Sequence, residues 1–209
     1  MRTPEELFNL INSVAFNKVG DDVDYTLWCD NDDPYTTYLL FKQSDSKRDW
    51  ANNLNFPVKL YNNQEYPIKV CKGWGNAWKS CNDYIMDELL SWLDEYKTTT
   101  LIIAGWSFGG AIAQLAAEDF YYRTGSKAFV ITFGSPKPLF GSKTLKRFKE
   151  SVVYSYNYAN VNDCVPLMPP FPLYHDINRI KTGKKVLFGL FNPNKWHCLY
   201  GDKSQYENL

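Results

Sequence analysis

A serine placed between two glycines is the most reactive arrangement that the sequence offers. Ser107 stands at the centre of Gly105-Trp106-Ser107-Phe108-Gly109, after an apolar run and before a helix-forming one. A serine hydroxyl attacks an acyl carbon when a base takes its proton and hydrogen-bond donors stabilise the oxyanion. The pattern predicts a sharp strand-to-helix turn with Ser107 at its tip, because the glycines relieve crowding between the two elements. The amide of Phe108, at the start of the helix, then supplies one oxyanion donor.

The serine motif has a competing, non-catalytic interpretation. Such a pattern arises by chance in roughly one chain of this size in ten or twenty, and a tight turn in a parallel-sheet protein also explains it. The flanking sequence favours catalysis. Residues 99–104 are β-branched and almost wholly apolar, as in a strand buried on both faces of a parallel sheet, and residues 111–122 have a helical composition.

Two histidines, His175 and His197, are the candidates for the base that activates Ser107. In hydrolases with this kind of turn the chain order is nucleophile, acid, base. Asp163 directly follows a predicted strand and precedes His197, so the sequence predicts the triad Ser107, Asp163 and His197. His175 lies close after Asp163 in a proline-rich region, and we expect it to have a structural role and to bond a backbone group. Asp176 is the alternative acid.

Two cysteines, Cys164 and Cys198, adjoin the predicted acid and base and raise the alternative of thiol or metal chemistry. Neighbouring side chains in extended or loop structure point apart, and two cysteines with two histidines at these spacings match no zinc pattern. We therefore expect neither a metal nor an organic cofactor. The total of five cysteines is odd and without paired metal-ligand spacing, which favours free thiols in a reducing compartment.

Alternating strands and helices are predicted to position these residues. Apolar residues at intervals of three and four indicate helices, and short apolar or alternating runs indicate strands. The predicted helices are a Thr3-capped helix through Val14 that stops near Gly20, then 76–96 with one break, 111–122 and 141–149. The predicted strands are 23–29, 36–41, a pair within 56–70, 99–104, 127–133 and 152–159, with mostly loop beyond residue 160. This order predicts an α/β fold with a mostly parallel central sheet flanked by helices, in one domain over residues 1–209.

Composition limits the classes of partner. Twenty-three basic residues balance twenty-three acidic ones without a block of like charge, which argues against nucleic acid or anionic lipid as a partner. The first six residues lack the basic character of a signal peptide, and the longest apolar runs are far too short to cross a bilayer. These features predict a soluble cytoplasmic protein without stable membrane insertion. They leave open a later release of the protein from the cell.

Four segments in the same order resemble the class 3 lipases, the fungal-type triacylglycerol lipase family with the α/β-hydrolase fold. They are residues 105–111 around the serine, 132–137 (Thr-Phe-Gly-Ser-Pro-Lys), 162–166 (Asn-Asp-Cys-Val-Pro) and the His197-x-x-Tyr200 pair. The resemblance covers about residues 36 to 200. It implies an ester hydrolase, with the acid at Asp163 and the base at His197.

Residues 40–45, Leu-Phe-Lys-Gln-Ser-Asp, resemble the strand end at which the family has Phe-Arg-Gly-Thr. By this resemblance Ser44 completes the oxyanion hole through its amide and hydroxyl. Lys42 and Gln43 stand where the family usually has arginine and glycine, a departure that affects the backbone of this loop.

Residues 70–74, Val-Cys-Lys-Gly-Trp, are similar to the Val-His-x-Gly-Phe segment of the family. Secreted members carry a lid helix near this segment, but the space between Gly73 and the helix expected from Asn76 is too short for a long one. We therefore expect little or no lid, which favours esterase or phospholipase-like activity. Trp74 and Trp106 are candidates to line an acyl pocket.

The resulting hypothesis is hydrolysis of a lipid or other acyl ester through an acyl-enzyme on Ser107. A thioesterase or an acyltransferase with the same triad is the nearest alternative, because a fold does not determine the acceptor. A noncatalytic binding protein that retains the scaffold is the second, and the altered Lys42-Gln43 pair favours it.

Overall fold

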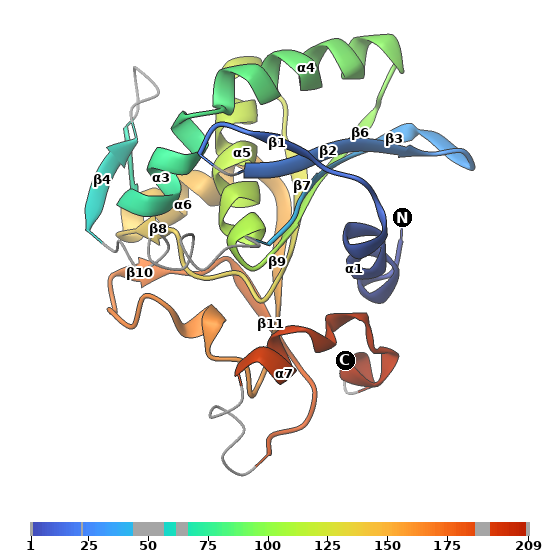
Figure 1. The fold of residues 1–209 in the computed structure, drawn as a ribbon. Helices are drawn as coiled ribbons and strands as arrows, with labels where there is room; N and C mark the ends of the chain where they lie inside the picture. Colours follow the sequence, from blue (N-terminus) through green and yellow to red (C-terminus); the bar gives the residue numbers. More distant parts are fainter. Residues whose placement is uncertain (1, 22, 44–56, 62–66, 187–192, 208–209) are drawn as a thin grey trace.

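A twisted sheet runs through the centre of the computed structural model and carries helices on both faces (Figure 1). The structure describes residues 2–21, 23–43, 57–61, 67–186 and 193–207. Within them the central sheet has the strand order β1-β2-β3-β6-β7-β9-β11, parallel from β3 to β11 and antiparallel from β1 to β3. The strands are β1 (Asn17–Val19), β2 (Val23–Asp30), β3 (Asp33–Phe41), β6 (Thr100–Trp106), β7 (Ala128–Phe133), β9 (Val152–Asn160) and β11 (Asn178–Thr182).

A smaller antiparallel sheet and the helices complete the described architecture. The small sheet has the order β10-β8-β5-β4, formed by β4 (Val58–Tyr61), β5 (Ile68–Cys71), β8 (Leu139–Phe140) and β10 (Tyr174–His175). The helices are α1 (Pro4–Ser13), α3 (Lys72–Lys79), α4 (Asn82–Glu95), α5 (Phe108–Thr124), α6 (Ser142–Ser151) and α7 (Pro193–His197). Short 3-10 helices are η1 (Val165–Leu167), η3 (Leu199–Gly201) and η4 (Lys203–Tyr206).

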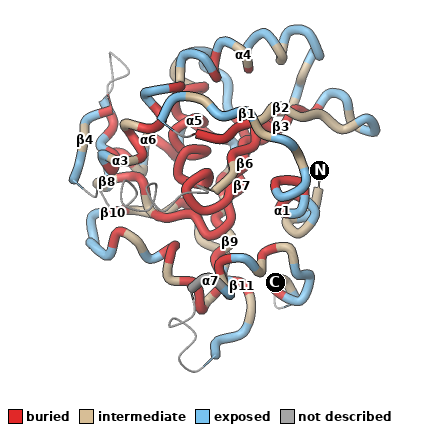
Figure 2. Tube along the Cα trace, viewed as in Figure 1, coloured by how far each residue is buried: buried red, intermediate tan, exposed pale blue. Residues whose placement is uncertain are grey.

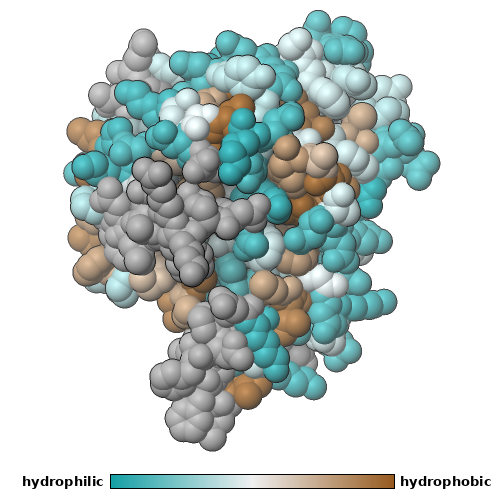
Figure 3. Space-filling view, viewed as in Figure 1, coloured by the Kyte–Doolittle hydropathy of each residue, from teal (hydrophilic) through white to brown (hydrophobic). Residues whose placement is uncertain are grey.

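Strand β6 divides the apolar interior into two clusters. Leu101 and Ile103 point to the face covered by α3, α4, α5 and α6, whereas Ile102, Ala104 and Trp106 point to the face covered by α1. This alternation follows from the two-residue period of a strand, and both faces are apolar because β6 is buried on both sides. Figure 2 shows the same result as a buried centre formed by α5 and the neighbouring strands. Outside it, the described surface in Figure 3 is mainly hydrophilic with small apolar patches.

Helix α1 ties the start of the chain to its end. It begins with the predicted cap, since the Thr3 hydroxyl accepts from the Glu6 amide and the Glu6 carboxylate accepts from the Thr3 amide. On its inner face the Phe8 ring lies 5.1 Å from the Trp106 ring and 5.7 Å from the Tyr200 ring of η3. The helix therefore packs against one face of the serine-bearing strand β6 and also contacts the C-terminal segment through Phe8.

Most predicted elements are confirmed, and the differences have local causes. Gly20 does not stop the first helix, which ends at Ser13; Gly20 lies instead in the turn between β1 and β2, with a φ of +55° that suits glycine. The predicted helix over 76–96 begins earlier, at Lys72, and breaks at Ser80 and Cys81 between α3 and α4. Strand β11 was missed, because its Asn-Arg-Ile-Lys-Thr sequence has one strongly apolar residue and lies at a sheet edge.

The expected shortage of space for a lid is confirmed between β5 and α3. The residues from Gly73 to Asn76 lie inside α3, so no extra segment separates β5 from the helix that follows. Residues 44–56, which include the rest of the upstream family-like segment, lie outside the described residues.

Candidate active site

Ser107 lies at the tip of the turn between β6 and α5, as the sequence predicts. Its backbone has φ 57° and ψ −121°, a conformation that L residues other than glycine rarely adopt. Such a residue carries a backbone strain of about 1–3 kcal/mol and persists only where the surroundings hold it. Here the Ser107 amide donates to the Phe133 carbonyl at 2.9 Å, which fastens the turn to the end of β7.

Glycines surround Ser107 because the backbone segments meet without room for side chains. A Cβ atom on Gly105 would lie 2.2 Å from the Gly109 carbonyl oxygen, and one on Gly109 would lie 2.5 Å from the Lys42 carbonyl oxygen. The steric reason inferred from the sequence is therefore confirmed. The second contact also shows that the end of β3 abuts the N-terminus of α5, where the amides of the first turn lack intrahelical partners.

Asp163 and His197 form a buried hydrogen-bonded pair. The Nδ1 atom of His197 lies 2.7 Å from Oδ2 of Asp163, and the Asp163 side chain is fully buried. A carboxylate at this distance fixes the tautomer with the proton on Nδ1, leaving Nε2 with a lone pair to accept a proton. Nε2 is buried and has no hydrogen-bond partner among the described residues. The pair thus presents one unsatisfied basic nitrogen, as the predicted base requires.

Two contacts bring His197 to the serine turn. The indole Nε1 of Trp106, the residue before Ser107, donates to the His197 carbonyl oxygen at 3.0 Å. On the other side Gly134, which follows the residue that accepts from the Ser107 amide, would place a Cβ atom 2.8 Å from the His197 ring. The nucleophile and base expected from the sequence therefore come from elements that meet at one end of the central sheet, after β6 and β7.

Asp163 has further partners that hold its carboxylate in place. Its Oδ2 atom accepts from the Tyr200 hydroxyl at 2.7 Å, and its Oδ1 atom accepts from the Val165 amide at 2.9 Å. Tyr200 is fully buried, and burial raises the pKa of its hydroxyl well above the ordinary value, so the group stays a donor. Sequence reasoning noted Tyr200 in a family-like segment without assigning this contact. The three-residue spacing from His197 was the available signal.

Gly134 is a second residue whose role the sequence did not reveal. Its φ is +56°, and an added Cβ would lie 2.9 Å from both the Asp163 Oδ2 atom and the His197 Nδ1 atom. We expect Gly134→Ala to cost about 1–3 kcal/mol of stability through strain and overpacking, and to lower ester hydrolysis by roughly 100-fold by displacing the pair. Urea unfolding and steady-state kinetics measure the two effects.

Gly125 provides the matched control for that substitution. It also has a positive φ, +71°, but an added Cβ would meet no atom within 4 Å at the end of α5. Gly125→Ala should therefore show the conformational cost without the loss of hydrolysis. Equal losses of hydrolysis in the two variants would contradict the steric argument.

His175 and Asp176, the alternative base and acid, do not form the buried pair. His175 lies in β10 of the small sheet, and its expected bond to a backbone group stays a prediction. Asp176 pairs with Arg179, whose Nε atom lies 2.7 Å from Oδ2, and also accepts from Asn157. The structure thus brings His197 to Asp163.

The predicted oxyanion and pocket residues that the structure describes lie in different elements. Phe108 opens α5 with its amide at the serine turn, while Ser44 lies outside the described residues. Trp74 is buried in the cluster beneath α3, and its expected contact with substrate stays a prediction. The Trp106 ring packs against α1 and its Nε1 atom donates to the His197 carbonyl, and its expected contact with substrate stays a prediction.

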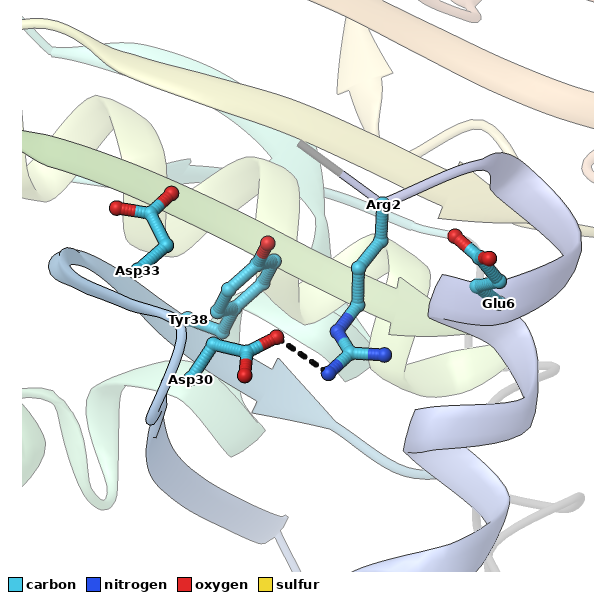
Figure 4. Close-up of a pocket in the computed structure, with 5 residues that line it drawn as sticks. All are labelled: Arg2, Glu6, Asp30, Asp33 and Tyr38. Atoms are coloured by element: carbon cyan, nitrogen blue, oxygen red, sulfur yellow. Dashed lines mark hydrogen bonds and ion pairs between the residues drawn. The ribbon is translucent and has the colours of Figure 1, made fainter.

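A polar hollow of about 230 Å³ lies beside α1 (Figure 4). It is lined by Arg2, Glu6, Asp30, Asp33 and Tyr38, and the Arg2 guanidinium points to Asp30 with 2.6 Å between the paired atoms. The ion pair fastens the start of the chain to β2. None of Ser107, Asp163 and His197 lines this hollow, so it is not the candidate active site.

All five cysteines fall in the described part of the chain and are free thiols there. Burial raises the pKa of Cys164 and Cys198, and nearby Asp163 adds to both shifts, so neither is an activated thiolate. Among the described residues, no three side chains of the kinds that hold metal ions come together. None of the described helices has both the length and the apolar character needed to span a membrane.

Comparison with known proteins gives consistent matches. The family described as Lipase (class 3) matches residues 38–173. The chain is 30% identical over 149 residues to a lipase of Rhizomucor miehei, which covers 66% of this chain and 39% of the relative. It is 26% identical over 137 residues to the secreted mono- and diacylglycerol lipase A of Penicillium cyclopium, covering 63% of this chain and 42% of the relative.

Solved structures show the same fold. The native Rhizomucor miehei lipase propeptide complex superposes with a TM-score of 0.70 at 23% identity, over 82% of this chain and 56% of that one. A lipase of Rhizopus microsporus var. chinensis superposes with a TM-score of 0.64 at 20% identity, over 75% and 55% of the two chains. The predicted α/β-hydrolase fold is thereby confirmed. The chain spans about two fifths of the length of the curated relatives it matches.

The prediction of a cytoplasmic location is wrong. Relatives are named as secreted lipases, which points to an extracellular protein. The prediction relied on first residues without the basic character of a signal peptide, on short apolar runs and on an odd number of cysteines. Those first residues form the capped start of α1, which packs on the sheet. Their composition reflects folding and carries no information on location.

Proposed function

The chain belongs to the class 3 lipases, and from that premise we propose that it hydrolyses carboxylic esters of lipids, with Ser107 as nucleophile, His197 as base and Asp163 as acid. The observation that carries the proposal is the 2.7 Å contact between His197 and Asp163, which leaves the buried Nε2 atom open beside a strained serine turn. Glycerol esters with one or two acyl chains are the first substrates to examine, since mono- and diacylglycerol lipases are among the relatives.

In the proposed mechanism the Ser107 hydroxyl gives its proton to Nε2 of His197 as its oxygen attacks the ester carbonyl. Asp163 accepts a hydrogen bond from the Nδ1 proton of His197 and stabilises the imidazolium that forms. The amide of Phe108 stabilises the oxyanion, and the resemblance to the family adds Ser44 as the second donor. The described end of β3, up to Lys42, lies against Gly109 at the start of α5. His197 then protonates the departing alcohol, and water hydrolyses the acyl-enzyme by the same steps in reverse order.

A fluorophosphonate probe tests the nucleophile. We expect covalent labelling of the folded protein, with the adduct on the peptide that contains Ser107 by mass spectrometry. Absence of an adduct, under conditions in which a control serine hydrolase reacts, would support the noncatalytic alternative.

Substrate panels separate the remaining enzymatic alternatives. Monoacylglycerol, diacylglycerol and p-nitrophenyl esters of increasing chain length should be hydrolysed faster than matched thioesters. Faster turnover of thioesters would support a thioesterase. Transfer of most acyl groups to an added alcohol, in place of water, would support an acyltransferase.

A further inference from the structure

A partly buried polar cluster of Asp176, Arg179 and Asn157 joins segments that the proposed mechanism leaves unexplained. Asp176 lies between β10 and β11 with its side chain 9% exposed. Its Oδ2 atom accepts from the Arg179 Nε atom at 2.7 Å, and both its oxygens lie 3.1 Å from the Asn157 Nδ2 atom. One carboxylate therefore collects hydrogen bonds from β9 and β11, the two neighbouring strands at this edge of the central sheet.

Arg179 connects this carboxylate to the loop that carries the acid. While Nε of Arg179 donates to Asp176, its Nη2 atom donates to the Pro166 carbonyl oxygen. Pro166 belongs to η1, whose first residue, Val165, gives its amide to Asp163. The planar guanidinium thus spans the distance between Asp176 and the Asp163 loop, which a single ammonium group does not do.

Asn157 connects the same carboxylate to the turn beneath His197. Its Nδ2 atom donates to the Ser135 carbonyl at 2.9 Å, and its Oδ1 atom accepts from the Ser135 amide at 3.1 Å. Ser135 follows Gly134, the residue that leaves no room for a side chain beneath the Asp163–His197 pair. Asp176 is therefore linked to both segments that enclose the pair.

We propose that Asp176 is a positioning residue: ionised, it holds Arg179 against the Pro166 carbonyl and fixes the Asp163 loop, and protonated, it loosens that loop. The inference rests on the proposed function, since its consequence is a pH-dependent orientation of His197. Among the described residues, Arg179 on β11 and Lys137 after β7 are charged groups that interact with the carboxylate, and His175 is its titratable neighbour in the chain.

The pH range follows from burial. Burial raises the pKa of Asp176 to about 6, against the opposing effects of Arg179 and Asn157. Above that pH the carboxylate attracts Arg179 as an ion, and below it the pair loses its charge-assisted bond. The wild-type enzyme should therefore lose positioning as the pH falls through 6.

The isosteric variant Asp176→Asn reproduces the uncharged state at every pH. We expect kcat at pH 8 to fall about tenfold with KM little changed, because misplacement of catalytic groups affects turnover more than binding. The ratio of wild-type to variant kcat should approach one below pH 5, where both proteins carry an uncharged side chain. A ratio that stays constant with pH, or that equals one throughout, would overturn the proposal.

A second variant and a control distinguish positioning from stability. Arg179→Lys keeps the positive charge, but a single ammonium group does not reach both Asp176 and the Pro166 carbonyl. This variant should fold and should lower kcat at pH 8 as Asp176→Asn does. Glu118→Gln removes another buried carboxylate, paired with Arg147 at 2.8 Å between α5 and α6. This control should change unfolding and leave the pH profile of kcat unchanged. A profile altered equally in Glu118→Gln would contradict a specific role for Asp176.

A measurement without turnover separates this inference from the proposed function. The chain has two histidines, so the His197 ring signals in an NMR spectrum can be assigned with His175→Ala. A histidine ring itself titrates in this pH range, so the two proteins are compared directly. Beyond the change that both share, the Nδ1 proton signal of His197 should show a transition with a midpoint near pH 6 in the wild type that is absent from Asp176→Asn. An inert wild type that shows the transition would contradict the proposed function and support the positioning role. Active wild type without it would overturn the positioning role alone.

Discussion

Replacement of Ser107 by alanine should abolish fluorophosphonate labelling and lower kcat for ester hydrolysis by about 10⁵- to 10⁶-fold, because no other group supplies the attacking oxygen. Replacement by glycine should have the same effect on activity but, unlike alanine, should raise the stability of the protein. The φ of 57° costs serine or alanine strain that glycine avoids, and we expect Ser107→Gly to gain roughly 1–2 kcal/mol. Labelling, kinetics and urea unfolding measure these outcomes.

The comparison between the two Ser107 variants serves as an internal control. Alanine keeps the backbone strain and removes the hydroxyl, so its unfolding should remain close to wild type. A glycine variant no more stable than the alanine variant would show that the turn is not strained. Residual labelling in either variant would show that Ser107 is not the nucleophile.

The second large effect is expected at the buried acid–base pair. Asp163→Asn should lower kcat about 10⁴-fold, because the amide no longer holds the His197 tautomer that accepts a proton at Nε2. His197→Ala should lower kcat to a similar extent, and the double variant should cost little more, since the residues act as a unit. Steady-state hydrolysis of a p-nitrophenyl ester over equal concentrations of folded protein measures all three.

His175→Ala provides the matched control, as it removes the other histidine from β10 in the small sheet. It should retain most of the activity. An inactive His175→Ala protein that still folds would transfer the role of base from His197 to His175.

The parts of the site whose local structure the sequence predicts depend on local rules. Residues 99–111 read as strand, glycine-flanked serine and helix because their periods and small residues change within a few positions. The choice of Asp163 and His197 needed only chain order and a family-like spacing, and the structure brings them within 2.7 Å.

The missed features depend on contacts distant in sequence. The Tyr200 hydroxyl reaches Asp163 because η3 turns it inward, and nothing near Tyr200 in the sequence specifies that partner. Gly134 is a glycine in a loop, as many are, and nothing in the sequence marks its position as crowded. The crowding becomes visible only in the fold, where the Asp163–His197 pair lies against it. Asp176 was an alternative acid by chain position alone, whereas tertiary packing pairs it with Arg179 and Asn157.

The contact between α1 and η3 has a consequence for the order in which the site forms during synthesis. Phe8 leaves the ribosome well before the ring that packs against it, because Tyr200 is synthesised almost two hundred residues later. The Asp163–His197 pair likewise waits for the same late segment. Until then the apolar face of α1 lacks part of its cover and is open to association with other chains. A nascent chain stalled before His197 can build β6 and the serine turn, but it has no completed triad.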